Sequence, residues 1–153
     1  MKRDSRLSRM LHVLLHMARF DGPVTSELIA RMLGTNPVVV RRTMAGLRDA
    51  GLVRSEKGHG GGWSLACDLA QVSLLDVHLA LGEPTIFAIG NAAESPDCLV
   101  EQAVNVALEG ALRDAGALLT ARLRSVTLAD LATDFERRFA AHQATEKEHS
   151  DVA

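Results

Sequence analysis

The four residues Gly34-Thr35-Asn36-Pro37 constrain the fold of this chain more than any others, because a regular helix does not continue through them. Gly34 accommodates the positive φ that ends a helix, Asn36 can cap the next helix, and Pro37 suits a first helical position. Apolar residues recur at helical spacing on both sides of this turn: Leu28, Ile29 and Leu33 before it, and Val40, Met44 and Leu47 after it. Two short helices joined by such a turn predict a helix-turn-helix.

The second helix of this pair is expected over residues 37–50, with the three apolar residues that follow the turn facing the core. Its outward side would carry Val38, Arg42, Ala45, Gly46 and Asp49, with Arg41 and Arg48 on the flank. Such a face suits the major groove of DNA: the small residues permit close approach, Arg42 can reach a guanine edge or a phosphate, and Val38 can meet a thymine methyl. The alternative is an ordinary solvated helix face that carries arginines.

A glycine-rich stretch follows, with four glycines among residues 58–62. Apolar residues on either side of it predict two short strands: Leu52, Val53, Trp63 and Leu65. Lys57 and His59 can supply positive charge, and the glycines let the main chain approach phosphates, so this hairpin suits the wing of a winged helix-turn-helix. A loose loop is one alternative. A nucleotide cradle is another, but the stretch lacks both the GxGxxG and P-loop patterns and a long helix directly after it.

Charge is divided unevenly along the chain. Residues 1–66 hold 11 Lys and Arg against 5 Asp and Glu, whereas residues 67–153 hold 6 against 14. A basic first half joined to an acidic second half predicts that the first half meets a polyanion. The four Phe and one Trp are too few for binding single strands by base stacking, which favours duplex nucleic acid.

A long helix is expected from about Cys98 to Arg124. It would span about 40 Å, which exceeds what one small domain needs. Its narrow apolar stripe predicts packing against another subunit, through Val104, Leu108, Ala111, Ala115, Leu118 and Leu119. Shorter helices are expected over residues 74–82 and 127–135, and residues 136–153 are expected to form a disordered tail.

The cysteines and histidines offer few ligands. Cys67 and Cys98 lack CxxC spacing, which argues against a disulfide framework or a structural zinc site. Cys98 begins the long helix, where a thiol becomes more acidic, so it is a candidate redox switch; the alternative is an inert small residue. His12 and His16 have a metal-binding spacing, but no third ligand is predictable nearby, so no metal site is expected.

Several classes of protein are not expected. No apolar run approaches 18 residues, so we expect no transmembrane helix and no membrane partner. Charged and histidine residues interrupt the apolar start of the chain and no cleavage site follows, so we expect a cytoplasmic protein without a signal peptide. No nucleophile–base pair or cofactor loop is visible, so an enzyme is not expected.

Three motifs together resemble the Rrf2 family of bacterial winged-helix regulators: "AGLV" after the second helix of the pair, "GGGW" in the hairpin and "SLLDV" beyond it. The resemblance covers roughly residues 5–135. It implies a mainly α fold with a small β-hairpin wing: a winged helix-turn-helix DNA-binding domain over residues 1–82 and a dimerisation region with the long helix over residues 83–135. It also implies a homodimer that reads pseudo-palindromic DNA, with half-sites about one helical turn apart.

Cluster-bearing members of that family place three cysteines in and just after the loop before the long helix. This chain has only Cys98 there, aligned with the last of the three, and the loop "IGNAAESPD" adds no thiol and no His. Neither an iron–sulfur cluster nor another cofactor is therefore expected. The segment "TNPVVVRR" is similar to the branch of the family without a cluster.

These observations predict a sequence-specific regulator that binds duplex DNA as a dimer and represses transcription by occluding a promoter. The alternative is a winged-helix adaptor that docks a metabolic enzyme through its acidic half. Thr35 and Asn36 are expected to donate to phosphate and Arg42 to read a base. The full set of predicted DNA contacts is Thr35, Asn36, Val38, Arg41, Arg42, Ala45, Lys57, Gly58, His59, Gly60 and Gly61.

Overall fold

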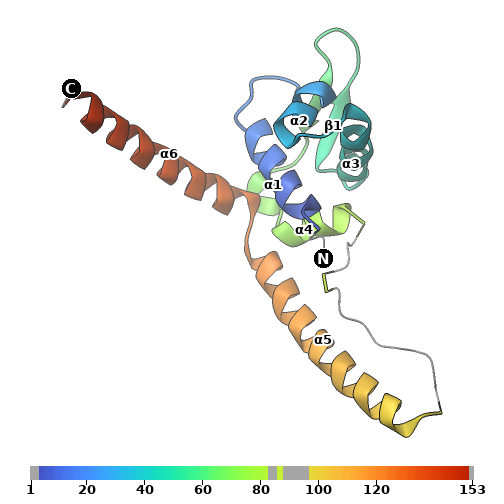
Figure 1. Ribbon diagram of the computed structural model, residues 1–153. Coiled ribbons are helices and arrows are strands. Elements are labelled where there is room, and N and C mark those ends of the chain that lie inside the picture. Colours follow the sequence, from blue (N-terminus) through green and yellow to red (C-terminus); the bar gives the residue numbers. More distant parts are fainter. Residues whose placement is uncertain (1–3, 83–85, 88–96, 152–153) are drawn as a thin grey trace.

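The computed structural model describes residues 4–82, 86–87 and 97–151, with side chains up to residue 147. These residues form, in order, α1 (Arg6–Met17), α2 (Ser26–Leu33), α3 (Pro37–Asp49), β1 (Val53–Glu56), β2 (Gly62–Leu65), η1 (Leu69–Gln71), α4 (Leu74–Ala80), α5 (Leu99–Ser125) and α6 (Leu128–Asp151) (Figure 1). A mainly helical chain with one antiparallel hairpin confirms the predicted fold class. Residues 83–85 and 88–96, which belong to the predicted dimerisation region, lie outside the described residues.

The helix-turn-helix forms as predicted, because side chains satisfy the free N–H groups at both helix starts. Thr25 Oγ1 accepts from the Leu28 N–H of α2 at 3.1 Å, and Asn36 Oδ1 accepts from the Val39 N–H of α3 at 3.0 Å. Gly34 ends α2 with a φ of 61°, in the left-handed region. The caps therefore set where each helix begins and how the chain turns between them.

One hydrophobic core contains side chains from α1, α2, α3 and α4, from the hairpin, and from Leu128, the first residue of α6. The residues predicted for the core side of α3, Val40, Met44 and Leu47, are all buried. The other elements contribute fully buried side chains as well, among them Val13, Leu14, Ile29, Val53, Val77 and Leu128. This core holds α3 and the hairpin against the rest of the first half of the chain.

The junction between α5 and α6 is hydrogen-bonded to the segment that precedes α4. The Leu74 N–H donates to the Val126 carbonyl and the Leu128 N–H donates to the Val72 carbonyl, each at 2.9 Å. Ser73 then starts α4 with a capping box, in which the Ser73 and Asp76 side chains accept from each other's backbone N–H groups. Both long helices therefore leave the core from one fixed point (Figure 1).

The long helix α5 has no buried residue along its 27 positions and extends away from the core (Figure 1). Several of its apolar side chains are largely exposed, including Leu99, Val100, Val104, Val106 and Leu118. Its length agrees with the predicted helix. No helix of the described residues combines the length and apolarity needed to cross a bilayer.

The last helix is longer than predicted. α6 continues to Asp151, so the prediction of a disordered tail is wrong for residues 136–151. Contacts one turn apart stabilise this polar helix: Asp134 pairs with both Arg137 and Arg138, and the Phe135 and Phe139 rings stack with centroids 5.8 Å apart. Ala, Glu, Gln and Lys in its second half also favour helix, although they form no apolar stripe.

Candidate nucleic-acid interface

The outward side of α3 is exposed and carries two arginines. Val38 is 58% exposed, and Arg41 and Arg42 are exposed beside it. Arg41 Nη1 lies 3.4 Å from Glu27 Oε1 on α2, so this arginine already has an anionic partner. The Arg42 guanidinium makes no hydrogen bond or ion pair within the described residues. Arg42 is therefore the arginine of α3 best placed to bond an external acceptor.

The turn before α3 presents donors at the helix start. The Asn36 side chain is exposed, and because its Oδ1 caps α3, its Nδ2 group is left as a donor. Thr35 is half-buried, and its N–H is used by the Ala30 carbonyl at 3.0 Å. Donors beside a helix N-terminus suit a phosphate, since the helix dipole attracts negative charge there.

One small residue of α3 serves packing and not the exposed face. A Cβ on Gly46 would lie 2.9 Å from the Ala80 carbonyl oxygen of α4, so Gly46 lets α3 pack closely on α4. Its predicted part in approaching DNA is wrong, because its free side is taken by a helix from outside the helix-turn-helix. Ala45 is half-buried at the edge of the exposed face.

The hairpin is fixed to the start of α2. Val53 pairs with Leu65 and Glu56 with Gly62 across the hairpin. Trp63 also exchanges backbone hydrogen bonds with Val24, at 2.8 and 2.9 Å. A Cβ on Gly62 would lie 2.6 Å from the Val24 carbonyl oxygen, so this third segment can approach only because position 62 is glycine. The hairpin is consequently held in a set orientation beside α3.

The Trp63 side chain also connects the hairpin to the start of α2, from within the core. This side chain is buried, and its Nε1–H donates to Ser26 Oγ, also buried, at 3.0 Å. A buried indole N–H needs such a partner, and here the partner is the first residue of α2. Trp63 thus ties strand β2 of the wing directly to the helix-turn-helix.

The tip of the hairpin is the most exposed part of the wing. Lys57, Gly58, His59 and Gly60 are exposed, and neither Lys57 nor His59 makes a side-chain hydrogen bond or ion pair within the described residues. Gly61 is half-buried, and a Cβ there would collide with the Glu56 carbonyl oxygen, so this glycine closes the tip. The tip places one lysine and one histidine on a tight, glycine-rich turn.

Three further residues, on α3, β1 and α1, were not among the predicted contacts. Val39 is 46% exposed next to Val38, because the first turn of a helix is accessible on more than one side. Arg54 is exposed on β1, with its Nε 3.3 Å from Glu56 Oε1. Arg9 of α1 donates to the Leu33 carbonyl at the end of α2. Alternation along β1 would have pointed to Arg54, whereas the Arg9 contact spans 24 residues and leaves no local signal.

The chain matches a known family of winged helix-turn-helix proteins over most of its length. A model of the Rrf2 family, described as iron-dependent transcriptional regulators, matches residues 3–134. The chain belongs to the Rrf2 family. Members of this family are transcriptional regulators, so the chain is a regulator with a winged helix and not an enzyme.

Individual Rrf2-like relatives agree with this family. The helix-turn-helix-type regulator YwnA of Bacillus subtilis is 33% identical over 129 residues, which covers 84% of this chain and 95% of YwnA. IscR of T. potens superposes with a TM-score of 0.60 at 25% identity, over 90% of each chain. A transcriptional regulator of Lactobacillus plantarum shares the fold, with a TM-score of 0.73 at 24% identity over 94% and 98% of the two chains.

The family description names iron, but the cysteines of this Rrf2 chain do not supply the usual set of ligands for an iron–sulfur cluster. The chain has two cysteines in all. Cys67 packs against the core, where burial raises the pKa of its thiol, with Asp68 acting in the same direction; Cys98 is exposed at the start of α5. Thiolates are the usual cluster ligands, and one exposed cysteine per chain supplies too few.

Other metal donors are equally sparse in the part of the chain that the structure describes. The His12 and His16 rings on α1 lie 4.6 Å apart between centroids. No group of three His, Cys, Asp or Glu side chains that could hold a metal ion occurs within the described residues. The Cys98 side chain makes no capping hydrogen bond to α5. Its role as a redox switch stays a prediction.

Proposed function

We propose that this Rrf2-family regulator binds duplex DNA sequence-specifically as a homodimer and represses transcription by occupying a promoter. The observation that carries the proposal is the exposed face of α3, with Arg42 unpaired within the described residues, beside a wing held in a set orientation with Lys57 and His59 at its tip. An α-helix fits the major groove and a glycine-rich loop can follow the phosphates. We also propose that the protein acts in the cytoplasm.

The proposed dimer rests on the exposed apolar face of α5. Of the six residues predicted for it, Val104, Ala111, Ala115 and Leu118 are exposed and the remaining two, Leu108 and Leu119, are half-buried. Leu118 is 76% exposed. Burying such side chains against a second α5 gains roughly 25 cal/mol for each Å² removed from water. Two-fold symmetry would then present two α3 helices to a pseudo-palindromic operator.

Selection of genomic fragments with the purified protein tests this function. We expect recovery of one pseudo-palindromic sequence at physiological salt. Arg42→Ala should relax preference at one position of each half-site, by about 1–3 kcal/mol. Arg137→Ala is the control, since it removes an exposed arginine of α6 away from this face.

Two outcomes would contradict parts of the proposal. An equal loss of affinity on every operator variant would make Arg42 a phosphate contact and remove its base-reading role. Failure to select any sequence would overturn DNA-specific regulation and favour an adaptor that docks another protein.

We further propose that the protein works without an iron–sulfur cluster, for which its two cysteines are insufficient. Anaerobically purified protein should lack the visible absorption bands of such a cluster. A stoichiometric cluster in that spectrum would refute this part of the proposal. A change in operator affinity after peroxide treatment that disappears in Cys98→Ala would identify Cys98 as a thiol switch.

A further inference from the structure

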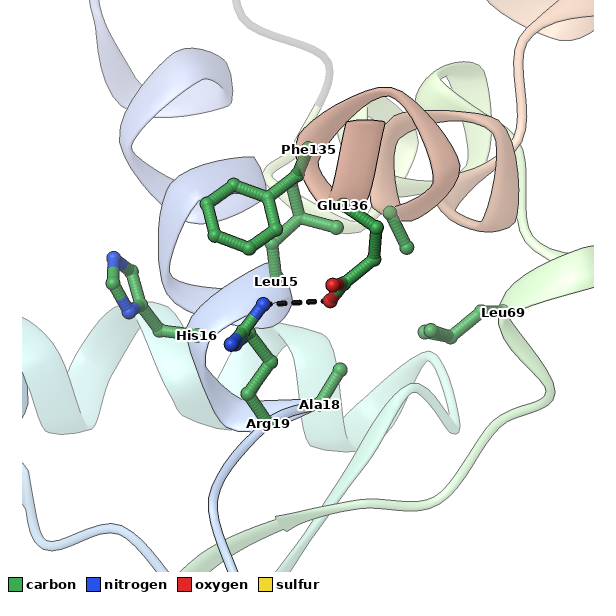
Figure 2. A pocket seen from close by; sticks show the side chains of 8 residues that line it. Leu15, His16, Ala18, Arg19, Leu69, Phe135 and Glu136 are labelled. Carbon is green, nitrogen blue, oxygen red and sulfur yellow. Dashed lines mark hydrogen bonds and ion pairs between the residues drawn. The ribbon is translucent and has the colours of Figure 1, made fainter. Parts of the chain in front are cut away.

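A pocket of about 260 Å³ lies where α6 meets the DNA-binding unit, away from the α3 face. Its wall comes from α1, η1 and α6 (Figure 2). Five of its lining residues are apolar: Leu15, Ala18, Leu69, Ala132 and Phe135. The volume is just below the usual range for ligand pockets, so it suits a compact molecule.

Two of the lining residues, Arg19 and Glu136, carry opposite charges and form an ion pair. Arg19 Nη1 lies 2.6 Å from Glu136 Oε1 (Figure 2). The Arg19 guanidinium carbon lies 4.6 Å from the centre of the Phe135 ring and 5.1 Å from that of Phe139. The stacking holds the guanidinium over an aromatic face. Burial lowers the pKa of His16, and the charges of His12 and Arg19 lower it further, so Arg19 is the cation of the pocket at pH 7.

Arg19 retains donors for a second acceptor. A guanidinium has five N–H groups in a planar fork. Within the described residues the Arg19 side chain donates one hydrogen bond, to Glu136. A carboxylate can therefore bond to the other nitrogens in the bidentate geometry that arginine favours, while an attached apolar group fills the space beside Leu15 and Ala132.

We propose that this pocket binds a small organic acid with a compact apolar body, and that the acid acts as an effector of DNA binding. The effector role rests on the function proposed above. α1 belongs to the DNA-binding core, whereas α6 leaves the same junction as α5. A ligand between α1 and α6 would change how the long helices sit on that core, and a change in affinity at one site implies the reciprocal change at the other.

Calorimetric titration of the full chain with phenylacetate and with hexanoate tests the site directly. We expect saturable binding, weakened about tenfold or more when phenylacetamide replaces phenylacetate, because the charge-assisted contact to Arg19 is lost. Arg19→Gln should weaken binding by a similar factor, and Ala132→Phe should abolish it by filling the pocket. The matched control is Arg6→Gln, an exposed, ion-paired arginine at the other end of α1.

Absence of acid binding at millimolar concentration, or binding unchanged in both Arg19→Gln and Ala132→Phe, would overturn the site. Ala132→Phe that shifts the monomer–dimer equilibrium without any acid binding would make the pocket a contact between copies and overturn it as well. Operator affinity measured in the same samples separates the two proposals. Acid binding without an effect on operator affinity refutes the effector role alone, whereas a wild-type chain that selects no operator refutes the proposed function and leaves the calorimetric result to decide the site.

Discussion

At the scale of single residues, Trp63 does more than fill the core. Its indole N–H donates to Ser26 at the start of α2, and its backbone pairs with Val24 in the segment before that helix. The wing is thereby joined to the helix-turn-helix by a side-chain and a main-chain contact at the same position. The orientation of the wing therefore depends on Trp63 together with Gly62, which leaves room for the Val24 segment.

Trp63→Phe removes that hydrogen bond and leaves the Ser26 hydroxyl buried without it. We expect a loss of at least about 1–3 kcal/mol in the free energy of unfolding, since an unpaired buried polar group carries its full desolvation cost. Urea denaturation measures the loss. In the double variant Trp63→Phe/Ser26→Ala part of the stability should return, and additive losses in the two single variants would exclude coupling between them.

At the scale of elements, α6 shows how a polar helix is maintained by its own side chains. Thr127 and Asp130 cap it reciprocally: the Thr127 N–H donates to Asp130 Oδ2 at 2.8 Å, and the Asp130 N–H donates to Thr127 Oγ1 at 3.1 Å. Arg138 Nε then lies 2.6 Å from Asp134 Oδ2, one turn away. Both carboxylates act only while they are ionised.

Acid should therefore weaken α6. The hydrogen bonds from the Thr127 backbone and hydroxyl lower the pKa of Asp130, and Arg138 followed by Arg137 lowers that of Asp134. A carboxyl group whose pKa is lower in the folded state than in the unfolded state stabilises the fold at pH values above its unfolded pKa of about 4. This stabilisation is lost as the pH falls from there through the lowered pKa of the folded state. Circular dichroism between pH 6 and pH 2.5 should show helix loss that is smaller in Asp130→Asn/Asp134→Asn.

The control for this titration is Asp114→Asn, which removes an exposed carboxylate from α5 and leaves the two on α6. It should lose helix as the wild type does. Identical acid profiles for the double variant and the wild type would show that these carboxylates do not stabilise α6.

Local sequence set some elements of this fold, and contacts between distant residues set others. The helix starts at Ser26, Pro37 and Leu74 were predictable because each depends on a capping residue one position earlier. The role of Gly46 was not, since the Ala80 carbonyl that it approaches lies on another helix. The length of α6 does not follow from apolar periodicity, because this helix lacks an apolar stripe and is stabilised by charge pairs between its own side chains.

The same distinction holds within the candidate DNA-binding face. Arg42 and the charged wing tip follow from their own short motifs, and both are exposed as the motifs require. The pairing of Arg41 with Glu27 depends on how α2 and α3 cross, which no local pattern encodes. Sequence therefore indicated where this face lies, and the packing of helices decided which arginine is left unpaired within the described residues.

At the scale of the whole molecule, α5 carries five of the large apolar side chains that are exposed within the described residues, which makes the oligomeric state open to direct test. Leu118→Glu places a charge within the proposed seam and should convert dimers to monomers in sedimentation velocity, with operator affinity reduced about tenfold or more. Ala117→Glu is the matched control, since at about 100° per residue position 117 lies about 100° from Leu118 and outside the predicted seam.

The free energy of unfolding of the monomer should be similar in Leu118→Glu and Ala117→Glu, because both side chains are exposed in the single chain. Dimers that persist in Leu118→Glu would place the seam elsewhere.

The contact between residues 72–74 and 126–128 also bears on how the protein is synthesised. Leu128 is fully buried in the core of the DNA-binding unit, yet the whole of α5 separates it from α4. Removing a buried leucine costs about 2–5 kcal/mol, so a nascent chain that ends at Gly82 lacks part of its own core. On the ribosome that core is completed only after α5 has been made. The first half of the chain therefore reaches its full stability when the helix proposed to bind a second copy is already present.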